Sequence, residues 1–566
     1  MHMLSRLFPV FTARGAGRRL NEQGLDLWAR GDLPQAERAF RGALRKDGAN
    51  AAATSNLGSL LMVLHRYDEG MALLQRATEL SPGGDAGPWV NLGNAWHFAG
   101  RGADAIACLR RALAIDPGHL EANLNILRPL LDDCDWDGID RQLRFVRERV
   151  AAEGSRGWRF VAPFASFFLP FTRAEQLAIA RYHAAAQFPE VRAAVPRPWD
   201  GRRRIRLGYL SSDFHDHPTM HLARGVFARH DRSRFEVFAY SIGAADSGPY
   251  RQQLVRDCDH FAEMHELGDQ AIADRIAQDG IDILLDLKGY TGGSRPGILA
   301  LRPAPVQVNY LGYPGTMGAP FIDWLVADAV LVPPEHADAY AEAILRLPHS
   351  YQPTDNLQPV DSAPVDRASV GLPEKAFVYC SFNVAAKFDR DSFAAWMRVL
   401  RAVPGSVLWL MEVSPAARAH LAAAARGHDV DPVRIVYADI LPKPRHLARL
   451  ALADLMLDAF VCNAHTTATD ALWAGLPLVT RIGQTFASRV AASLLHAVDL
   501  PDLAVDSEDA FVELAVRMAQ EPGRLAAARA VLAGRAASPL FDTDGYVRAL
   551  DQALLSLVQP LNSRRP

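Results

Sequence analysis

The chain has 566 residues, of which 49% are apolar and 22% are charged, a balance typical of folded globular proteins. That length predicts about three or four domains, and the composition excludes a largely disordered chain, a collagen-like chain and a coiled-coil rod. The 61 basic and 64 acidic residues leave a formal net charge of −3, so no overall charge draws the chain toward nucleic acid or a membrane surface.

Short features along the chain indicate a cytoplasmic protein. We expect residues 1–19 to form a tail or a first helix, because their apolar stretch, Leu7–Phe11, is too short for the core of a signal peptide. The longest apolar run, Val161–Phe171, is about half a membrane span and contains two prolines, so it cannot cross a bilayer. The five cysteines lie far apart, without the spacing of a disulfide framework or a zinc site, which fits a reducing compartment.

Residues 20–135 contain an internal repeat of 34 or 35 residues. Small residues at fixed positions and a glycine or proline near each unit's end resemble the tetratricopeptide repeat, a helical hairpin. One hairpin cannot bury its apolar face alone, so we expect the hairpins to stack into a superhelix with a concave groove. A fourth, weaker unit is predicted to begin near Leu120 and to fade by Trp136. The matched positions are Gly24, Ala36, Phe40 and Ala43, then Gly58, Gly70, Leu74 and Ala77, then Gly93, Ala105, Leu109 and Ala112.

A polar residue stands two positions before the first glycine of each unit: Glu22, then Asn56, Asn91 and, in the weak unit, Asn125. We expect this position to lie on the exposed face of the inner helix. An amide both donates and accepts hydrogen bonds, so a ladder of asparagines can hold an extended peptide backbone without contacting its side chains. The alternative is that asparagine is only a tolerated polar residue there. Repeats of this type usually bind proteins, so we expect a protein partner or a protein substrate.

Residues 136–200 are predicted to form a helical connector interrupted by prolines, ending at Arg197–Asp200. Beyond it, short β-rich runs alternate with helical stretches in two series, divided near Asp361–Glu374. This alternation predicts parallel, doubly wound sheets, so we expect two Rossmann-like domains at 201–365 and 366–566, the second ending in a C-terminal helix. No G-x-G-x-x-G sequence follows a strand and no Walker motif is present, so a nicotinamide or P-loop site is not indicated. The expected strands are Ile205–Ser211, Phe235–Ile242, Ile281–Leu287, Val306–Leu311 and Trp324–Val330, then Phe377–Phe382, Val407–Val413, Arg434–Tyr437, Leu455–Phe460 and Leu476–Arg481.

Polar residues follow several of these strands, where ligands bind in such folds. After the expected strand Leu455–Phe460, a polar loop leads into a helix expected over Thr469–Trp473. Helix N-terminal amides and threonine hydroxyls suit a phosphate, Lys387 and Lys443 add charge for a diphosphate, and Asp470 can accept from ribose hydroxyls. Taken singly, each residue is ordinary, a cap or a surface charge. Their recurrence at the strand ends of one domain favours a binding site.

Together these segments resemble a known family. The repeats, followed by HDHP, LGYPGT, CSFN with a lysine, and NAHTTATDALWAGLPLV, are similar to the bacterial O-linked N-acetylglucosamine transferases, protein glycosyltransferases of family 41. The resemblance implies a fold of class α plus α/β, with a tetratricopeptide superhelix followed by a GT-B pair of Rossmann-like domains. It also implies inverting transfer of N-acetylglucosamine from UDP-GlcNAc, without cofactor or metal, to Ser or Thr hydroxyls of proteins. No DxD motif stands where a metal would bridge a diphosphate, which agrees with the last point.

The resemblance also implies roles for single residues. Lys387 matches a lysine that contacts the diphosphate, and His217 matches the active-site histidine. His217 is a candidate general base because its ordinary pKa suits that work, with Asp213 and Asp246 as lesser candidates, or else it positions the sugar or acceptor. The turn expected to border the sugar and acceptor pocket is Gly312, Tyr313, Pro314, Gly315 and Thr316. The nucleotide-sugar site is expected to contain Leu441, Pro442, Lys443, His446 and Arg449 around the uracil and ribose, His465, Thr466 and Thr467 at the diphosphate, and Asp470 at the ribose.

One position departs from the family pattern, because Val384 stands where many members have a glutamine near the diphosphate. A related branch uses GDP-fucose, so a transferase with another nucleotide sugar or a non-protein acceptor stays open. A repeat scaffold with an inactive nucleotide-binding half is a third hypothesis, against which Lys387, His217 and the His465–Thr467 loop argue. Three to four repeats form a short groove, so acceptor choice is expected to depend more on residues near the catalytic cleft.

Overall fold

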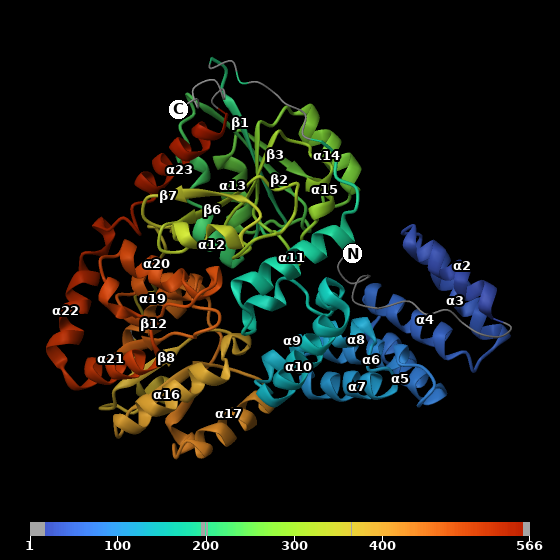
Figure 1. Cartoon of the computed structure of the whole chain (residues 1–566), viewed down its shortest axis with the longest axis horizontal. Coiled ribbons are helices and arrows are strands. Elements are labelled where there is room, and N and C mark those ends of the chain that lie inside the picture. Colours follow the sequence, from blue (N-terminus) through green and yellow to red (C-terminus); the bar gives the residue numbers. More distant parts are fainter. Residues whose placement is uncertain (1–16, 194–198, 200–201, 364, 559–566) are drawn as a thin grey trace. The chain divides into compact units, whose positions relative to one another are not determined.

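The computed structural model describes residues 17–193, 199, 202–363 and 365–558 (Figure 1). It contains two compact units, one running to Val161 and including Val413–His420, the other formed by Ala162–Glu412 and the chain from Leu421 onward. Most of the expected tail at 1–19, and the end of the expected connector at 194–198 and 200–201, lie outside the described residues. Among the described helices, none is long and apolar enough to cross a membrane.

The first unit is built of helical hairpins, which confirms the three matched repeats. Each repeat's first glycine faces a bulky residue of the following helix: a Cβ added at Gly24, Gly58 or Gly93 would lie 2.5, 2.9 or 2.8 Å from side-chain atoms of Phe40, Leu74 and Leu109. This close helix contact explains the recurring small residue. The helices are α2 (Arg18–Ala29), α3 (Leu33–Lys46), α4 (Ala51–Val63), α5 (Tyr67–Leu80), α6 (Gly87–Phe98) and α7 (Gly102–Ile115).

A fourth, irregular repeat completes the first of the two compact units. Its first helix is broken into α8 (Leu120–Asn125) and α9 (Leu127–Asp132), and the long α10 (Trp136–Glu153) follows. A Cβ added at Gly138 of α10 would lie 2.5 Å from Leu130 of α9, the same kind of close contact as in the regular repeats. The segment expected to be a connector from residue 136 is therefore divided, with α10 belonging to the repeat unit.

The asparagines expected on an exposed groove face are not exposed in the first two cases. Asn56 and Asn91 are both 0% accessible. The Asn56 amide donates to Asn21 Oδ1 of α2, and the Asn91 amide donates to Ser55 Oγ of α4, each at 3.0 Å. Asn125 is half-buried and donates to Asn94 Oδ1 at 3.0 Å. The expected exposure is wrong for Asn56 and Asn91, which are buried and bond residues of the neighbouring hairpin. A role of these amides in holding a peptide stays a prediction.

The second unit begins with a short 3-10 helix (η2, Ala165–Phe168) and α11 (Arg173–Gln187), which starts with a capping box between Thr172 and Glu175. This segment packs on the sheet domain that follows. The Phe167 ring meets the Tyr313 ring at 4.9 Å between centroids. A Cβ on Gly318 would lie 2.4 Å from the backbone of α11, so Gly318 permits close approach of the helix.

The first sheet has seven parallel strands in the order β3-β2-β1-β4-β5-β6-β7. The chain order reverses between β1 and β4, and ligands bind beside such a reversal. The strands are β1 (Ile205–Ser211), β2 (Phe235–Ser241), β3 (His260–Glu263), β4 (Ile283–Asp286), β5 (Val306–Asn309), β6 (Trp324–Asp328) and β7 (Ala343–Leu347). The helices are α12 (Pro218–Ala223), α13 (Pro249–Asp257), α14 (Asp269–Gln278) and α15 (Pro296–Ala300).

The second sheet has six parallel strands in the order β10-β9-β8-β11-β12-β13, with its reversal between β8 and β11. Its core includes the fully buried Trp396 and Trp409. The strands are β8 (Val378–Ser381), β9 (Val407–Met411), β10 (Ile435–Ala438), β11 (Leu455–Leu457), β12 (Leu478–Arg481) and β13 (Ala504–Val505). The helices are α16 (Arg390–Ala402), α17 (Pro415–Gly427), α18 (Lys443–Arg449), α19 (Thr466–Trp473), α20 (Val490–Ala497), α21 (Glu508–Gln520) and α22 (Pro522–Ala533).

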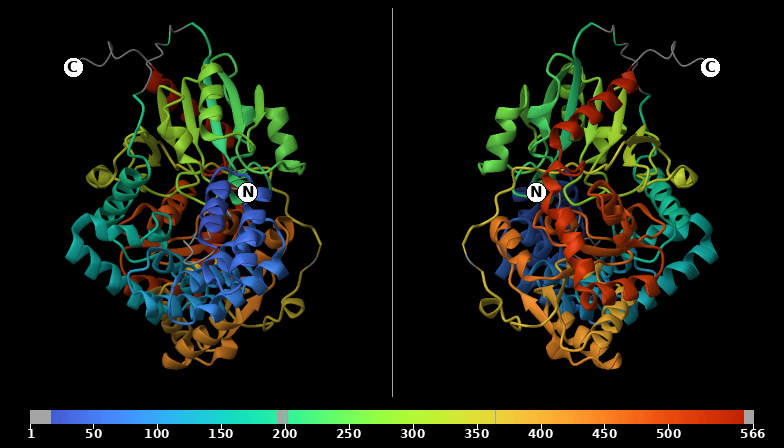
Figure 2. Two further views of the ribbon diagram at one scale, coloured as in Figure 1. Left: turned by 90° about the vertical axis from the view of Figure 1, so that its right-hand side faces the viewer. Right: turned by 90° about the vertical axis from the view of Figure 1, so that its left-hand side faces the viewer.

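The last helix, α23 (Thr543–Val558), returns to the first sheet and packs beside β7, as Figure 2 shows for the red helix. Asp551 of α23 bonds the His230 ring at 2.5 Å and the Asp231 amide at 2.9 Å. The His230 ring also bonds the Tyr209 hydroxyl of β1 at 2.7 Å. The C-terminal helix expected at the end of the second domain therefore packs against the domain built on the first sheet. We call that domain the first lobe and the domain built on the second sheet the second lobe.

Candidate functional site

The loop after β11 and the start of α19 form a candidate anion site. The buried Asp458 carboxylate accepts from the amides of Ala459 and Ala464 at 2.8 and 2.7 Å, which fixes the loop between them. Helix α19 begins at Thr466, three residues earlier than expected, so Thr466 and Thr467 both lie in its first turn and are partly exposed. Their amides and hydroxyls are available where the helix dipole favours negative charge.

Lys387 lies beside this helix start. It ends a 3-10 turn (η6, Ala385–Lys387) after β8, and its Nζ donates to the Asn463 carbonyl at 2.5 Å. Burial, together with the positive charge of Lys387, holds the pKa of His465 well below its usual range, so the ring is neutral. The His465 Nε2 bonds the Ala487 carbonyl at 3.2 Å. The structure thus brings together the four residues that the sequence assigned to a diphosphate.

An ion pair between Lys443 and Asp470 lies at the same edge of the sheet. Lys443 begins α18 after Pro442, and its Nζ contacts Asp470 Oδ1 of α19 at 2.6 Å. Burial raises the pKa of Asp470, while the charges of Lys443 and of His221, on α12 of the other lobe, lower it. Helices α12 and α19 are in contact, so the first lobe faces this pair. A carboxylate and an ammonium held together can bind adjacent hydroxyls.

Helix α18 also carries His446 and Arg449, which contact each other and the Phe382 ring. The Arg449 guanidinium donates to His446 Nδ1 at 2.8 Å and lies 4.8 Å from the Phe382 ring centroid. Burial and the charges of Arg449 and Lys443 lower the pKa of His446 to about 3. Because Nδ1 accepts, the neutral ring carries its proton on Nε2 and can donate one hydrogen bond. Leu441 is partly buried and Pro442 exposed, beside an exposed Ile440 that the sequence analysis did not single out.

The first lobe contributes His217 as the N-cap of α12. Its Nδ1 accepts from the Thr219 amide at 3.2 Å and lies 3.4 Å from Asp213 Oδ2. Asp213 in turn contacts Lys288 Nζ at 2.6 Å. Burial lowers the pKa of His217 to about 4, with Lys288 and the neighbouring histidines adding to the effect and Asp213 opposing it. The His217 imidazole is therefore neutral at neutral pH.

The sequence analysis missed two residues of the charged cluster around His217. Asp286 is the last residue of β4 and Lys288 follows it, across the point where the strand order reverses. Asp286 accepts from the amides of Lys288 and Gly289 at 3.0 and 2.9 Å. Burial raises the pKa of Asp286 to about 7. A charged Asp-Leu-Lys-Gly sequence ending an apolar strand was the available signal. Asp246, a lesser candidate base, is exposed and caps its own turn through the Gly248 amide at 3.0 Å.

The turn of Gly312–Thr316 is mostly buried. A Cβ on Gly312 would lie 2.0 Å from the Leu287 carbonyl oxygen, so only glycine fits against the strand-end loop that carries Lys288. Thr316 donates to the buried Glu342 carboxylate at 2.6 Å, and Tyr313 packs against Tyr290 and Phe167. Among the five residues, only Gly312 is partly exposed. A role for the turn's backbone at the sugar stays a prediction.

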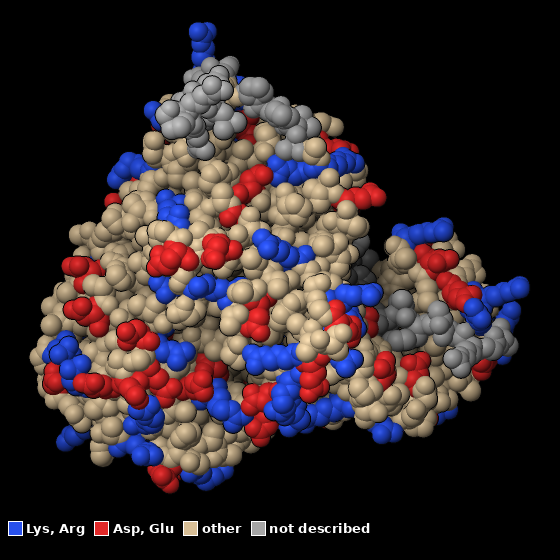
Figure 3. Space-filling view, in the orientation of Figure 1, with Lys and Arg blue, Asp and Glu red and all other residues tan. Residues whose placement is uncertain are grey.

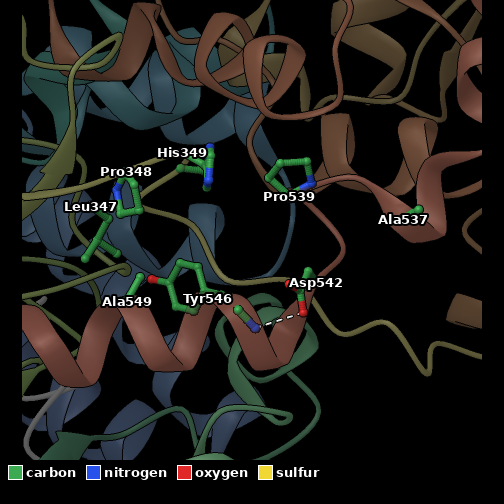
Figure 4. A pocket seen from close by; sticks show the side chains of 10 residues that line it. Leu347, Pro348, His349, Ala537, Pro539, Asp542, Tyr546 and Ala549 are labelled. Atoms are coloured by element: carbon green, nitrogen blue, oxygen red, sulfur yellow. Dashed lines mark hydrogen bonds between the residues drawn. The ribbon is translucent and has the colours of Figure 1, made fainter.

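Other surface features do not add to this site. A pocket of about 200 Å³ between the end of β7 and α23, lined by Leu347, His349, Pro539 and Tyr546 among others, shares no residue with it (Figure 4). Positive and negative side chains are interspersed over the face shown in Figure 3, which agrees with the near-neutral net charge. Among the described residues, no group of three His, Cys, Asp or Glu could hold a metal ion.

Comparisons with known proteins agree with the fold and the motifs. Residues 133–363 and 353–550 match Glycosyl transferase family 41, and residues 21–85 match a tetratricopeptide repeat family. A relative from Arabidopsis thaliana, the probable UDP-N-acetylglucosamine–peptide N-acetylglucosaminyltransferase SEC, is 39% identical over 365 residues, covering 63% of this chain and 37% of that protein. The Caenorhabditis elegans UDP-N-acetylglucosamine–peptide N-acetylglucosaminyltransferase is 30% identical over 557 residues, covering 76% and 48%.

A solved structure is similar over nearly the whole chain. A mutant O-GlcNAc transferase from Thermobaculum terrenum matches with a TM-score of 0.69 and 26% identity, covering 96% of this chain and 98% of that one. The chain spans less than half the length of the curated relatives from Arabidopsis and Caenorhabditis. The family match covers both Rossmann-like lobes and every strand-end residue described above. On these grounds the chain belongs to glycosyltransferase family 41.

Proposed function

We propose that this protein transfers N-acetylglucosamine from UDP-GlcNAc to Ser or Thr hydroxyls of proteins, with inversion and without a metal. The observation that carries the proposal is the meeting of Lys387 with the N-terminus of α19, next to the Lys443–Asp470 pair. Family membership supports the reaction class, and the names of the relatives support the sugar and the peptide acceptor.

The second lobe supplies what a leaving nucleoside diphosphate needs. As the bond between the anomeric carbon and the diphosphate breaks, negative charge grows on the phosphate oxygens. Lys387 and the amides at the start of α19 stabilise that charge from fixed positions. We assign Thr466 and Thr467 to the same oxygens through their hydroxyls. These groups supply positive potential from the chain itself, and we expect transfer to continue in the presence of EDTA.

The nucleoside end is recognised by α18 and α19. We assign Asp470 and Lys443 to the ribose hydroxyls, because their 2.6 Å contact presents an acceptor and a donor together. His446 is neutral and carries Nε2–H, so it donates to a carbonyl oxygen of the uracil. Leu441 and Pro442 lie directly before α18 and offer apolar surface to the base.

We assign acceptor recruitment to the helical-repeat unit, since stacked hairpins of this kind form extended binding surfaces. The proposed compartment is the cytoplasm. Four of the five cysteines are buried, and Cys108, Cys258, Cys380 and Cys462 are free thiols, which fits a reducing environment.

A donor screen with a transfer readout tests the proposal. The full chain is heated with UDP-GlcNAc, UDP-glucose, UDP-GalNAc or GDP-fucose, and candidate acceptor proteins are then examined by intact mass. We expect the largest thermal stabilisation and the addition of N-acetylhexosamine with UDP-GlcNAc. A preference for GDP-fucose supports a different sugar transferase, and binding without transfer to any lysate protein supports a scaffold. Either result contradicts the proposal.

A further inference from the structure

A buried ion pair lies behind the active-site histidine. Lys288 Nζ contacts Asp213 Oδ2 at 2.6 Å, and the two side chains are only 4% and 9% exposed. They come from opposite sides of the strand reversal, Asp213 after β1 and Lys288 after β4. A buried lysine costs free energy unless it is paired, so this contact is a defined feature of the site rather than a surface ion pair.

The same Asp213 oxygen lies 3.4 Å from His217 Nδ1, which also receives the Thr219 amide at 3.2 Å. A backbone N–H can only donate, so the nitrogen that receives it holds no proton. His217 therefore cannot bond the Thr219 amide and donate to Asp213 through the same nitrogen. Nδ1 is expected to bind a proton only when the Asp213 carboxylate has no other cation in contact with it.

We propose that Lys288 is a positioning residue that sets the tautomer of His217. By neutralising Asp213, Lys288 leaves His217 Nδ1 free of a proton, so that the neutral ring presents Nε2–H to the substrate as a hydrogen-bond donor. The proposal deepens the proposed transferase function and rests on it for its consequence. In this arrangement His217 orients the sugar or the acceptor through Nε2–H and does not act as the general base through that nitrogen.

The surroundings of the ring support a neutral, donating state. The side chain is 37% exposed, and Nδ1 is the nitrogen that meets the Thr219 amide and Asp213, which leaves Nε2 for a substrate. The charged and titratable groups that face it are Asp213, His215 and His221 from its own segment, and Lys288 with Asp286 behind it from the β4 loop. His221 is bonded to Asp216 at 2.6 Å and faces the Lys443–Asp470 pair of the second lobe. Burial lowers the pKa of His217, and Asp213 is the group that opposes this effect.

The direct test is the protonation state of His217 in the full chain. Nitrogen-15 labelled histidine spectra, assigned with His217→Asn, are expected to show Nε2 protonated and Nδ1 unprotonated in the wild type at pH 7. In Lys288→Met, Asp213 has no cationic partner, so we expect His217 to bind a proton at Nδ1 and its pKa to rise by about one to three pH units. Lys288→Arg keeps the charge and is expected to keep the wild-type spectrum.

The pH profile of transfer gives a second readout. Protonation of Nδ1 breaks the bond from the Thr219 amide, so the ring loses the orientation in which Nε2–H meets the substrate. In Lys288→Met the acidic limb is therefore expected to move to higher pH, with the rate at pH 7 falling and recovering above pH 8. Lys288→Met combined with Asp213→Asn removes both charges and is expected to return the limb to its wild-type position. A purely structural role for Lys288 predicts a loss at every pH that Asp213→Asn does not reverse.

Two results would overturn the proposal: a wild-type ring protonated at Nδ1, or a His217 titration that is the same in wild type and Lys288→Met. If Lys288→Met does not fold, the proposal is still tested by the tautomer of the wild type. Spectra of Lys288→Arg and of the variant that combines Lys288→Met with Asp213→Asn test it further. The spectra need no donor or acceptor. A protein that shows the expected tautomer but transfers no sugar contradicts the proposed function and leaves the assignment of Lys288 intact.

Discussion

The two Rossmann-like lobes place charged side chains at their strand ends in different ways. In the second lobe, Lys387 is bonded to a backbone carbonyl and remains partly exposed at the start of a helix. In the first lobe, Lys288 and Asp213 are buried and neutralise each other behind a half-exposed histidine. The lysine of the second lobe contacts a carbonyl and reaches solvent, whereas the lysine of the first lobe is buried against a carboxylate. The second lobe also holds an ion pair of its own, Lys443–Asp470.

This difference indicates a division of work. An anion such as a diphosphate gains most from a cation that is not in direct contact with a carboxylate. Lys387 contacts a backbone carbonyl, and the buried Asp458 carboxylate acts on it through its charge. A balanced buried pair binds no anion, but it fixes the proton positions of the group beside it. We infer that the second lobe holds the donor and stabilises the leaving group, while the first lobe orients the reacting atoms. The predictions below test this division, from the largest expected effect to the smallest.

Replacing Lys387 by methionine is expected to have the largest effect. The change keeps side-chain bulk but removes the charge that meets the leaving diphosphate, so kcat is expected to fall by about 10²–10³-fold. UDP binding is expected to weaken less, and thermal unfolding to stay unchanged. Transfer kinetics and calorimetry with UDP check this. Lys375→Met, an exposed lysine of the same lobe, is the control. Equal losses in kcat and in UDP affinity would assign Lys387 to ground-state binding alone.

Breaking the Lys443–Asp470 pair is expected to weaken donor binding rather than slow the chemical step. Hydrogen bonds to charged groups contribute about 1.5–3 kcal/mol, so Lys443→Met or Asp470→Asn is expected to raise the Kd for UDP about 10- to 100-fold. Because the two side chains act as one unit, the double variant is expected to cost little more than either single variant. Additive losses would show that each binds a different part of the donor.

The parts of the fold that the sequence predicted are the buried ones. The predicted strand Ile205–Ser211 matches β1, and the predicted Val407–Val413 contains β9, which ends two residues earlier at Met411, because strands inside a parallel sheet are continuously hydrophobic. The strands that were missed, β3, β7 and β13, are partly exposed edge strands and lack a continuous buried run, whereas the fourth edge strand, β10, was predicted. Edge position is a tertiary property, and no local pattern encodes it.

The same limit applies to the site. The second-lobe residues were found because His465, Thr466, Thr467 and Asp470 stand in one short segment. Lys288 was not found, since it meets Asp213 only through the parallel pairing of β1 with β4. The exposure of Asn56 was predicted wrongly for a related reason: an amide that suits a peptide backbone also suits a neighbouring helix, as its bond to Asn21 shows.

His446 provides a smaller effect with a distinct dependence on pH. Because the pKa of His446 is lowered to about 3, the ring is neutral at every working pH, and its binding of a base does not titrate near 6.5. Uridine, which lacks a phosphate, is therefore expected to bind with constant affinity from about pH 5 to pH 8. His446→Gln is expected to weaken this binding about tenfold, the loss of about one hydrogen bond. An acidic limb near pH 6.5 that disappears in His446→Gln would contradict the neutral assignment.

The smallest expected change is a gain. Val384 is 55% exposed and stands one residue after the buried Asn383, at the position where many members of the family carry a glutamine near the diphosphate. Val384→Gln is expected to lower the Kd for UDP-GlcNAc about two- to fivefold, since a hydrogen bond at an exposed position contributes about 0.5–1 kcal/mol. Val433→Gln, at a 76% exposed valine of the same lobe, is the matched control. If calorimetry shows the same gain with GDP-fucose, the new amide contacts only the diphosphate, and donor choice depends on α18; a gain confined to UDP-GlcNAc means that position 384 takes part in that choice.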